Sequence, residues 1–216
     1  MEILITGANR GIGATLRASY LARGHRATGT ARHAQSGPGW LTMDVSDAAS
    51  ITAAARDYGD KPLDLLVCNA GVYPDKSGGP HAYAPDQWAK GFAVNVMGVF
   101  LTVEAFLPAL HRAASPKIAI IASQMGSSKR APGGSYIYRA SKAAAINLGR
   151  NLATDLAPDG IAVGIYHPGW VQTDMGGPQA QIDSATSADG LIARFDTLSP
   201  ATTGVFEDYT GAPLDF

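Results

Sequence analysis

The feature that most constrains this chain is a regular alternation between short apolar segments and longer segments with helical periodicity. The clearest apolar segments are 3–6, 63–68, 117–122 and 161–166. Strands that lack an alternating polar face are typical of sheets covered on both sides. Helices between successive strands favour parallel crossover connections. The pattern therefore predicts an α/β fold with a single doubly wound parallel sheet of about seven strands and helices on both faces.

The expected elements follow this alternation along the chain. Strands are expected at 3–6, 26–31, 41–44, 63–68, 117–122, 161–166 and 204–208. Helices are expected at 11–23, from a cap at Ser46 or Asp47 to residue 58, at 87–112 with an end near Pro108, at 138–157 and at 188–198. In such sheets ligands bind beyond the carboxyl ends of the strands, so we expect functional residues in the loops that follow them.

Length and composition indicate one domain, residues 1–216. The chain has 216 residues, and 46% of them are hydrophobic, which is enough to build a core and excludes disorder as the main state. It carries 17 basic and 18 acidic residues without a basic stripe, so we expect no nucleic-acid partner. The longest uncharged segment, 160–173, contains Pro168 and is too short to span a membrane, so we expect no membrane partner.

The cellular setting is inferred from two features. Residues 3–5 follow Met1 without a basic region, which argues against a signal peptide. Cys68, the single cysteine, cannot form an internal disulfide. Both features favour a cytoplasmic location.

A glycine-rich turn links the first strand to the first helix. Gly7 can adopt a tight turn, Gly11 lets the backbone approach a pyrophosphate, and Gly13 lets the helix pack close to the strand. The free N–H groups and positive dipole end of the helix would bind phosphates. An ordinary glycine turn is the alternative, but the preceding strand and the following helix favour phosphate binding.

Tyr138 and Lys142 are four residues apart at the start of a predicted helix, which puts both side chains on one face. A nearby ammonium lowers the pKa of a phenol and makes it a useful acid or base near neutral pH. The alternative is a surface tyrosine that stacks on a lysine stem.

Several motifs, taken together and in order, resemble the short-chain dehydrogenase/reductase family. The matching segments are the turn 6–13, Asp44-Val45, Asn69-Ala70-Gly71, Asn95 within 94–98, Ser123 within 122–126, the pair in 138–142, and Pro168-Gly169 with Thr173. Cys68 departs from the pattern, because many members have asparagine there. The segments 169–177 and 203–211 are similar to the sniffer and C-factor branch. The resemblance implies a Rossmann-type fold and an oxidoreductase that uses a nicotinamide dinucleotide.

The resemblance also implies four catalytic residues. Tyr138 would donate a proton to the substrate oxygen, and Lys142 would lower the pKa of Tyr138 and bind the nicotinamide ribose. Ser123 would orient the carbonyl oxygen, and Asn95 would hold a water that links Lys142 to solvent. The alternative for Ser123 is a loop serine bonded to its own backbone, but its place at the end of the central strand favours the functional role. Taken alone, Asn95 is better explained as an amide that packs a helix, and its catalytic role is inferred only together with the other three residues. His167 is given no catalytic role.

The same resemblance implies an extended cofactor site. Its expected residues are Gly7, Asn9, Arg10, Gly11, Ile12, Gly13, Arg32, Asp44, Val45, Asn69, Ala70, Gly71, Tyr138, Lys142, Pro168, Gly169, Val171 and Thr173. Asp44 is expected to contact adenine, although it could be an acid at a helix N-terminus.

The preferred cofactor is expected to be NADP(H). Enzymes with this fold that use NAD place an acid at the end of the second strand, and this chain has no acid between Glu2 and Asp44. Arg10 and Arg32 could face a 2′-phosphate instead. NAD(H) stays open, because Arg32 could merely stack on adenine.

The substrate side is expected to include residues that follow strand ends: Tyr73, Gln124, Trp170 and Met175. The aromatic members could instead belong to the core. Segment 176–198 is a candidate substrate lid, with its Gly-, Gln- and Ser-rich part at 176–187, and a plain surface loop is the alternative. No metal site is expected.

Two functions from different classes remain. The first is an NADPH-dependent reductase of aldehydes or ketones, with a small carbonyl or alcohol as its substrate. The second is a dinucleotide-binding regulatory or signalling protein with little turnover. A homodimer is expected through helices 87–112 and 138–157, unless their small residues only pack on the sheet.

Overall fold

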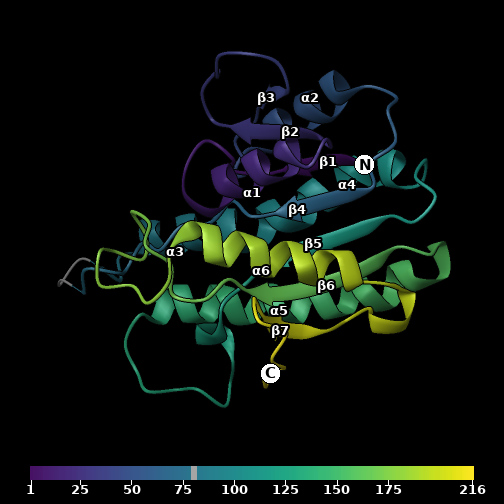
Figure 1. Ribbon diagram of the computed structural model, residues 1–216. Helices are drawn as coiled ribbons and strands as arrows, with labels where there is room; N and C mark the ends of the chain where they lie inside the picture. The colour runs from purple at the N-terminus through teal and green to yellow at the C-terminus, as the bar shows by residue number, and fades with distance from the viewer. Residues whose placement is uncertain (79–81) are drawn as a thin grey trace.

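The computed structural model of the chain describes residues 1–78 and 82–216, which contain one parallel sheet of seven strands (Figure 1). The strands are β1 (Glu2–Ile5), β2 (Arg26–Ala31), β3 (Trp40–Thr42), β4 (Leu65–Cys68), β5 (Lys117–Ile121), β6 (Ala162–His167) and β7 (Phe206–Asp208). Their order is β3-β2-β1-β4-β5-β6-β7. The direction of winding reverses between β1 and β4, which is the switch point where such sheets bind ligands. The predicted doubly wound fold is confirmed.

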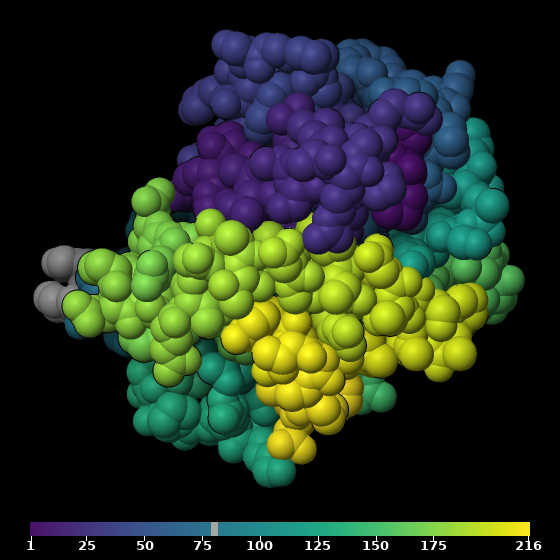
Figure 2. Space-filling model, viewed as in Figure 1, coloured from purple at the N-terminus to yellow at the C-terminus, as the bar shows by residue number. Residues whose placement is uncertain are grey.

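Helices cover both faces of the sheet (Figure 1). They are α1 (Gly11–Ala22), α2 (Ala48–Tyr58), α3 (Pro85–Phe92), α4 (Gly98–Leu110), α5 (Tyr136–Leu156) and α6 (Ser184–Thr197). On one face α1 and α6 bury Tyr20 and Phe195 against the strands, and Figure 2 shows the two segments side by side on the surface, α1 in purple and α6 in light green to yellow. On the other face α2, α4 and α5 bury Tyr58, Phe106 and Leu152.

The helix expected at 87–112 differs from the prediction in three ways. It begins at Pro85, where proline needs no N–H partner, and it ends at Leu110. Between α3 and α4 it contains a π-helical turn, Ala93–Met97. Its end lies two residues beyond Pro108, which is itself inside the last turn of α4. Pro108 is exposed and near the helix end, so water can satisfy the carbonyl group that it leaves without a donor.

This same helical segment, Pro85–Leu110, is long and apolar enough to cross a membrane by length and composition. Its apolar composition has a second explanation in the fold. Val99, Val103 and Phe106 of α4 are buried in the hydrophobic core beside the sheet, as in a core helix of a globular domain.

The C-terminal part of the candidate lid is core structure. Residues 184–197 form α6, which begins four residues before the predicted start because Asp183 caps it by accepting a hydrogen bond from the Thr186 N–H at 2.7 Å. Ala188 and Leu191 of this helix are buried. This part of the lid prediction is corrected, and the candidate lid narrows to 176–183.

Candidate active site

A cleft of about 610 Å³ opens at the switch point. Most of the expected cofactor residues line it: Gly7, Asn9, Arg10, Gly11, Ile12, Gly13, Arg32, Asp44, Val45, Asn69, Ala70, Gly71, Tyr138, Lys142, Pro168 and Thr173. The other two, Gly169 and Val171, lie outside the lining. Gly169 makes a turn at φ +85°, and Val171 is buried beside Ile182.

The glycine turn and the loop after β4 pack tightly against each other. A Cβ atom on Gly7 would lie 3.0 Å from the Ala70 Cα, and one on Gly13 would lie 2.5 Å from the Asn69 amide nitrogen. Thr6 Oγ1 accepts hydrogen bonds from the backbone N–H groups of Asn69 and Ala70, at 3.0 and 2.9 Å. The glycines are therefore required for the close approach of the two loops.

This turn fits an anionic ligand. Among the described residues, no side chain caps the N-terminus of α1, so its N–H groups remain free beside the cleft. Free N–H groups and the helix dipole favour phosphate oxygens at this point. Gly11 has φ +55°, a left-handed conformation that glycine adopts without strain. The residues present are thus compatible with the pyrophosphate of a dinucleotide.

Charged side chains line the cleft just beyond the ends of β2 and β3. Arg32 and Asp44 both line it. Asp44 accepts hydrogen bonds from the Ser46 hydroxyl and N–H groups at 2.7 and 2.9 Å, which lower the pKa of its carboxyl group. The cap of α2 is Asp47, whose carboxylate accepts from the Ala49 N–H at 2.9 Å.

Arg10 is paired with a residue that the sequence analysis missed. Its guanidinium donates to the Asp174 carboxylate at 2.8 Å, and both side chains are largely exposed. Because Asp174 also lines the cleft, this ion pair spans its mouth between the glycine turn and the loop after β6.

Tyr138 and Lys142 lie on one face of α5 and are both buried. Burial raises the pKa of Tyr138 to about 12, against the opposing effect of a hydrogen bond with Ser123. Burial also lowers the pKa of Lys142 to about 8. The Lys142 ammonium group lies 5.8 Å from the Tyr138 ring centroid and donates to the Ile121 carbonyl at 2.8 Å. Desolvation therefore sets the net direction of the Tyr138 pKa shift, and the lowering of that pKa by Lys142 stays a prediction.

Ser123 follows β5 and is buried. Its hydroxyl accepts a hydrogen bond from the Met125 N–H at 3.1 Å and caps the short turn Gln124–Gly126. The same hydroxyl opposes the rise of the Tyr138 pKa, so it lies close to the phenol as well. The position of Ser123 is thus compatible with both interpretations, a loop serine bonded to its own backbone and a hydroxyl beside the phenol.

Asn95 lies in the π-helical turn and is 1% exposed. Its amide oxygen accepts from the Val72 N–H, and its amide nitrogen donates to the Val72 carbonyl and to the Ser141 hydroxyl, each at 2.9 Å. These contacts tie the loop after β4 to α5. Asn95 itself is outside the cleft lining, and its predicted role in holding a water stays a prediction.

The four expected substrate-side residues lie in different places. Met175 lines the cleft. Tyr73 packs on Tyr138, with ring centroids 4.1 Å apart. Trp170 is 46% exposed, lies outside the cleft lining, and donates from its indole N–H to the Gly176 carbonyl at 2.9 Å.

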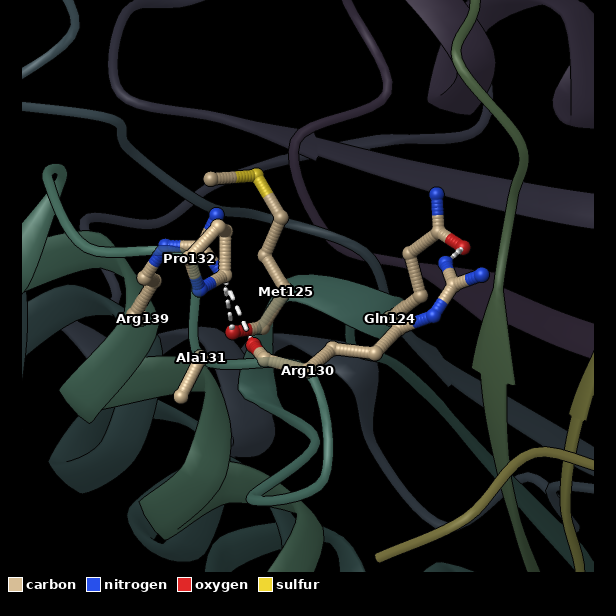
Figure 3. Close-up of a pocket in the computed structure, with 6 residues that line it drawn as sticks. All are labelled: Gln124, Met125, Arg130, Ala131, Pro132 and Arg139. Atoms are coloured by element: carbon tan, nitrogen blue, oxygen red, sulfur yellow. Dashed lines mark hydrogen bonds between the residues drawn. The ribbon is translucent and has the colours of Figure 1, made fainter.

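Gln124 lines a second pocket of about 410 Å³ (Figure 3). Its other lining residues are Met125, Arg130, Ala131, Pro132 and Arg139. Arg130 donates to the Gln124 side-chain oxygen, and Arg139 reaches back to the backbone carbonyl groups of Met125 and Arg130, as the dashed lines show. This pocket adjoins the site along the chain, because Gln124 follows Ser123 and Arg139 follows Tyr138.

Several lining residues were not predicted. Lys90 and Val94 reach the cleft from α3 and the π-helical turn, and Gln172 and Asp174 reach it from the loop after β6. Lys90 and Val94 are about one helical turn apart, and Asn95 directly follows Val94 in the sequence. That spacing is the sequence signal that could have found them.

A phosphate-binding glycine turn at the switch point of a doubly wound sheet, beside a buried phenol and amine, defines a Rossmann-type protein that binds a nicotinamide dinucleotide. The sequence model of a family described as short chain dehydrogenase matches residues 2–183. The chain therefore belongs to the short-chain dehydrogenase/reductase family of oxidoreductases, which act on small-molecule substrates.

Known proteins similar to this chain agree with that assignment. C-signal of Myxococcus xanthus is 41% identical over 170 residues, which cover 76% of this chain and 99% of that protein. The NADPH-bound carbonyl reductase from chicken fatty liver superposes with TM-score 0.91 and 28% identity, covering 100% of this chain and 98% of the other. Carbonyl reductase Sniffer of D. melanogaster has TM-score 0.91 and 29% identity, with 100% and 99% covered.

Proposed function

We propose that this protein is an NADP(H)-preferring reductase of aldehydes or ketones. The observation that carries the proposal is the position of Tyr138 and Lys142, two buried ionisable side chains in the same cleft as the glycine turn. Perturbed ionisable groups in a cleft are typical of catalytic sites. The similarity to two carbonyl reductases supports the same reaction class.

The bound cofactor supplies the hydride, and the protein's own residues handle the oxygen atom. With a pKa of about 12, Tyr138 keeps its proton at neutral pH and can donate it to the carbonyl oxygen as hydride reaches the carbon. The Ser123 hydroxyl, whose oxygen accepts from the Met125 N–H, can donate its single proton to the same substrate oxygen and orient the carbonyl. Lys142 can donate to a ribose hydroxyl from its buried position.

The NADP(H) preference rests on two arginines and on a missing acid. β2 contains no Asp or Glu, and Arg32 and Arg10 lie along the cleft. A guanidinium binds a 2′-phosphate through two charge-assisted bonds that a 2′-hydroxyl cannot match. The chicken carbonyl reductase, similar over its length, is NADPH-bound. Use of NAD(H) is the alternative.

The loop after β6 is the proposed lid. A bridge between Val171 and Ile182 and a bond from the Gln172 N–H to the Ile182 carbonyl, at 2.8 Å, close its base. These two contacts fix the ends of the loop. Residues 176–183 are the segment of the loop that would cover a small carbonyl or alcohol next to Met175.

A homodimer through α3–α4 and α5 is also proposed. Trp88, Met97 and Phe100 are large hydrophobic side chains exposed on α3, the π-helical turn and α4, and Tyr136 is exposed on neighbouring α5. An exposed apolar patch of this kind is typical of an interface between subunits. Light scattering should give a dimer mass at micromolar concentration, and Phe100→Asp should give the monomer.

A second candidate function is a regulatory or signalling protein with little turnover, which the 41% identity to C-signal favours. Turnover of a panel of aldehydes, ketones and quinones with NADPH and NADH separates the two. Carbonyl-dependent NADPH oxidation supports the reductase. Tight cofactor binding without turnover across the panel would favour the regulator.

A further inference from the structure

The N-terminus of α5 is held by a carboxylate from a distant part of the chain. Asp75, in the loop after β4, is 1% exposed. Its carboxylate accepts hydrogen bonds from the backbone N–H of Ile137 at 2.8 Å and from that of Tyr138 at 3.2 Å. The capping acceptor thus lies more than 60 residues before the helix in sequence, and it binds the backbone of the proposed proton donor itself.

Ser135, the residue that precedes α5, does not cap the helix with its own side chain. Ser135 has a side chain typical of a helix cap, but it adopts the left-handed conformation at φ +49° and, in the described part of the chain, makes no capping bond. Its hydroxyl is bonded to the Tyr73 hydroxyl at 2.5 Å instead. The capping function has moved to Asp75.

The loop that carries Asp75 is fixed at its other end. Asn95 bonds both backbone groups of Val72, and it also bonds Ser141 of α5. Between these anchors, the ring of Tyr73 stacks on the ring of Tyr138 at an interplanar angle of 16°. Residues 72–75 therefore contact the start of α5 through a backbone cap, a hydroxyl pair and an aromatic stack.

Capping of a helix does not by itself require a buried carboxylate. Asp47 and Asp183 cap α2 and α6 from exposed positions next to their own helices. Burial of a carboxylate is costly unless hydrogen bonds and the helix dipole compensate for it. At Asp75 both carboxylate oxygens are used by N–H groups at the helix start, which fixes the carboxylate in one place.

We propose that Asp75 is a positioning residue for Tyr138. Its carboxylate fixes the backbone at the start of α5 and thereby the position and direction of the Tyr138 phenol. This inference rests on the proposed function, in which Tyr138 donates the proton. Asp75 lies outside the cleft lining, so it acts through Tyr138 and not on the cofactor or substrate.

The test compares Asp75→Ala and the milder Asp75→Asn with a matched cap variant, Asp47→Ala. Misplacement of a catalytic group by about 1 Å can cost on the order of a hundredfold in rate. We expect Asp75→Ala to lower kcat at least about tenfold, with a smaller loss in Asp75→Asn, which keeps one acceptor oxygen. The Kd for NADPH should stay near the wild-type value, and the solvent deuterium isotope effect on kcat should rise. Asp47→Ala should leave all three quantities unchanged.

Thermal denaturation of each variant shows that it is folded at the assay temperature. Should Asp75→Ala prove unfolded, the same readouts from Asp75→Asn decide. A kcat near the wild-type value in folded Asp75→Ala, or in Asp75→Asn where Asp75→Ala is unfolded, would overturn the inference, as would an equal loss in Asp47→Ala. Tyr138→Phe separates this failure from that of the proposed function: if it remains active, the function fails, and if it is inactive while the Asp75 variants are active, only the positioning role fails.

Discussion

The ring of Tyr73 lies parallel to that of Tyr138, with centroids 4.1 Å apart and an angle of 16° between the planes. One face of the phenol ring is therefore covered by protein, and a substrate must approach Tyr138 past its hydroxyl edge or its other face. The stack also restricts rotation of the ring about its axis.

Removal of the Tyr73 ring should be more harmful than removal of its hydroxyl group. An aromatic pair contributes about 0.5–1.5 kcal/mol beyond burial, so Tyr73→Ala should lower kcat/KM by roughly tenfold through a less ordered Tyr138. Tyr73→Phe keeps the stack and should stay within about threefold of wild type. Steady-state kinetics with one carbonyl substrate makes the comparison. Equal losses in both variants would show that the hydroxyl pair, and not the stack, matters.

Replacement of Lys142 should stabilise the protein while it abolishes turnover. Burial lowers the pKa of this ammonium to about 8, and each pKa unit corresponds to about 1.4 kcal/mol. Lys142→Met removes that cost but leaves the buried Ile121 carbonyl without its donor, which costs about 1–3 kcal/mol. The free energy of unfolding at pH 7 should therefore rise by roughly 1 kcal/mol.

The pH dependence of this gain has a definite sign. Between pH 8 and the ordinary lysine pKa of 10.5, the unfolded chain binds more protons at this group than the folded protein does. Wild-type stability thus gains from this group as pH rises, and the advantage of Lys142→Met should shrink toward pH 10.5. Urea denaturation at pH 7 and at a pH near 9.5 measures it. A variant that is less stable than wild type at pH 7 would contradict the argument.

The Arg10–Asp174 pair should affect cofactor affinity more than stability. Both side chains are exposed, so the pair should contribute less than about 1 kcal/mol to folding. Asp174→Asn frees Arg10 and removes a negative charge from the cleft, which should lower the KM for NADPH by roughly threefold at low salt. Asp189→Asn, which breaks the similarly exposed pair with Arg23, should change neither quantity. An unchanged KM in Asp174→Asn would assign Arg10 no part in phosphate binding.

The charge at Arg32 should decide the choice of cofactor. Arg32→Asp should change the ratio of kcat/KM for NADPH over NADH from above one to below one, through repulsion of the 2′-phosphate and a new contact to the ribose hydroxyl. Arg56→Asp, on α2 and outside the cleft lining, is the control. A wild-type ratio at or below one would contradict the assigned roles of Arg10 and Arg32.

The sheet and the cofactor cleft could be predicted because they rest on local patterns. β2 was predicted with its observed bounds, and the segments around Gly7, Asn69 and Tyr138 carry recognisable spacings. The π-helical turn at Asn95 could not be predicted, since no spacing distinguishes it from an α-helix. The capping of α5 by Asp75 was also missed, because it joins residues far apart in sequence and the local cap candidate, Ser135, has its hydroxyl turned to Tyr73.

The effect of burial on the pKa of Tyr138 could not be predicted for a related reason. The spacing from Lys142 identifies a charged neighbour, but it does not measure burial. Desolvation raises the pKa of the phenol, which favours its protonated form at neutral pH. The predicted direction of the reaction, reduction, agrees with a phenol that keeps its proton.

Tyr138→Phe tests most directly whether the Tyr138 hydroxyl donates the proton. The change removes one oxygen atom and keeps the ring that stacks on Tyr73. Carbonyl-dependent oxidation of NADPH should fall by about a hundredfold to ten-thousandfold in kcat, while the Kd for NADPH measured by fluorescence stays within about threefold of wild type. A Phe variant whose kcat remains within about threefold of wild type would contradict the account.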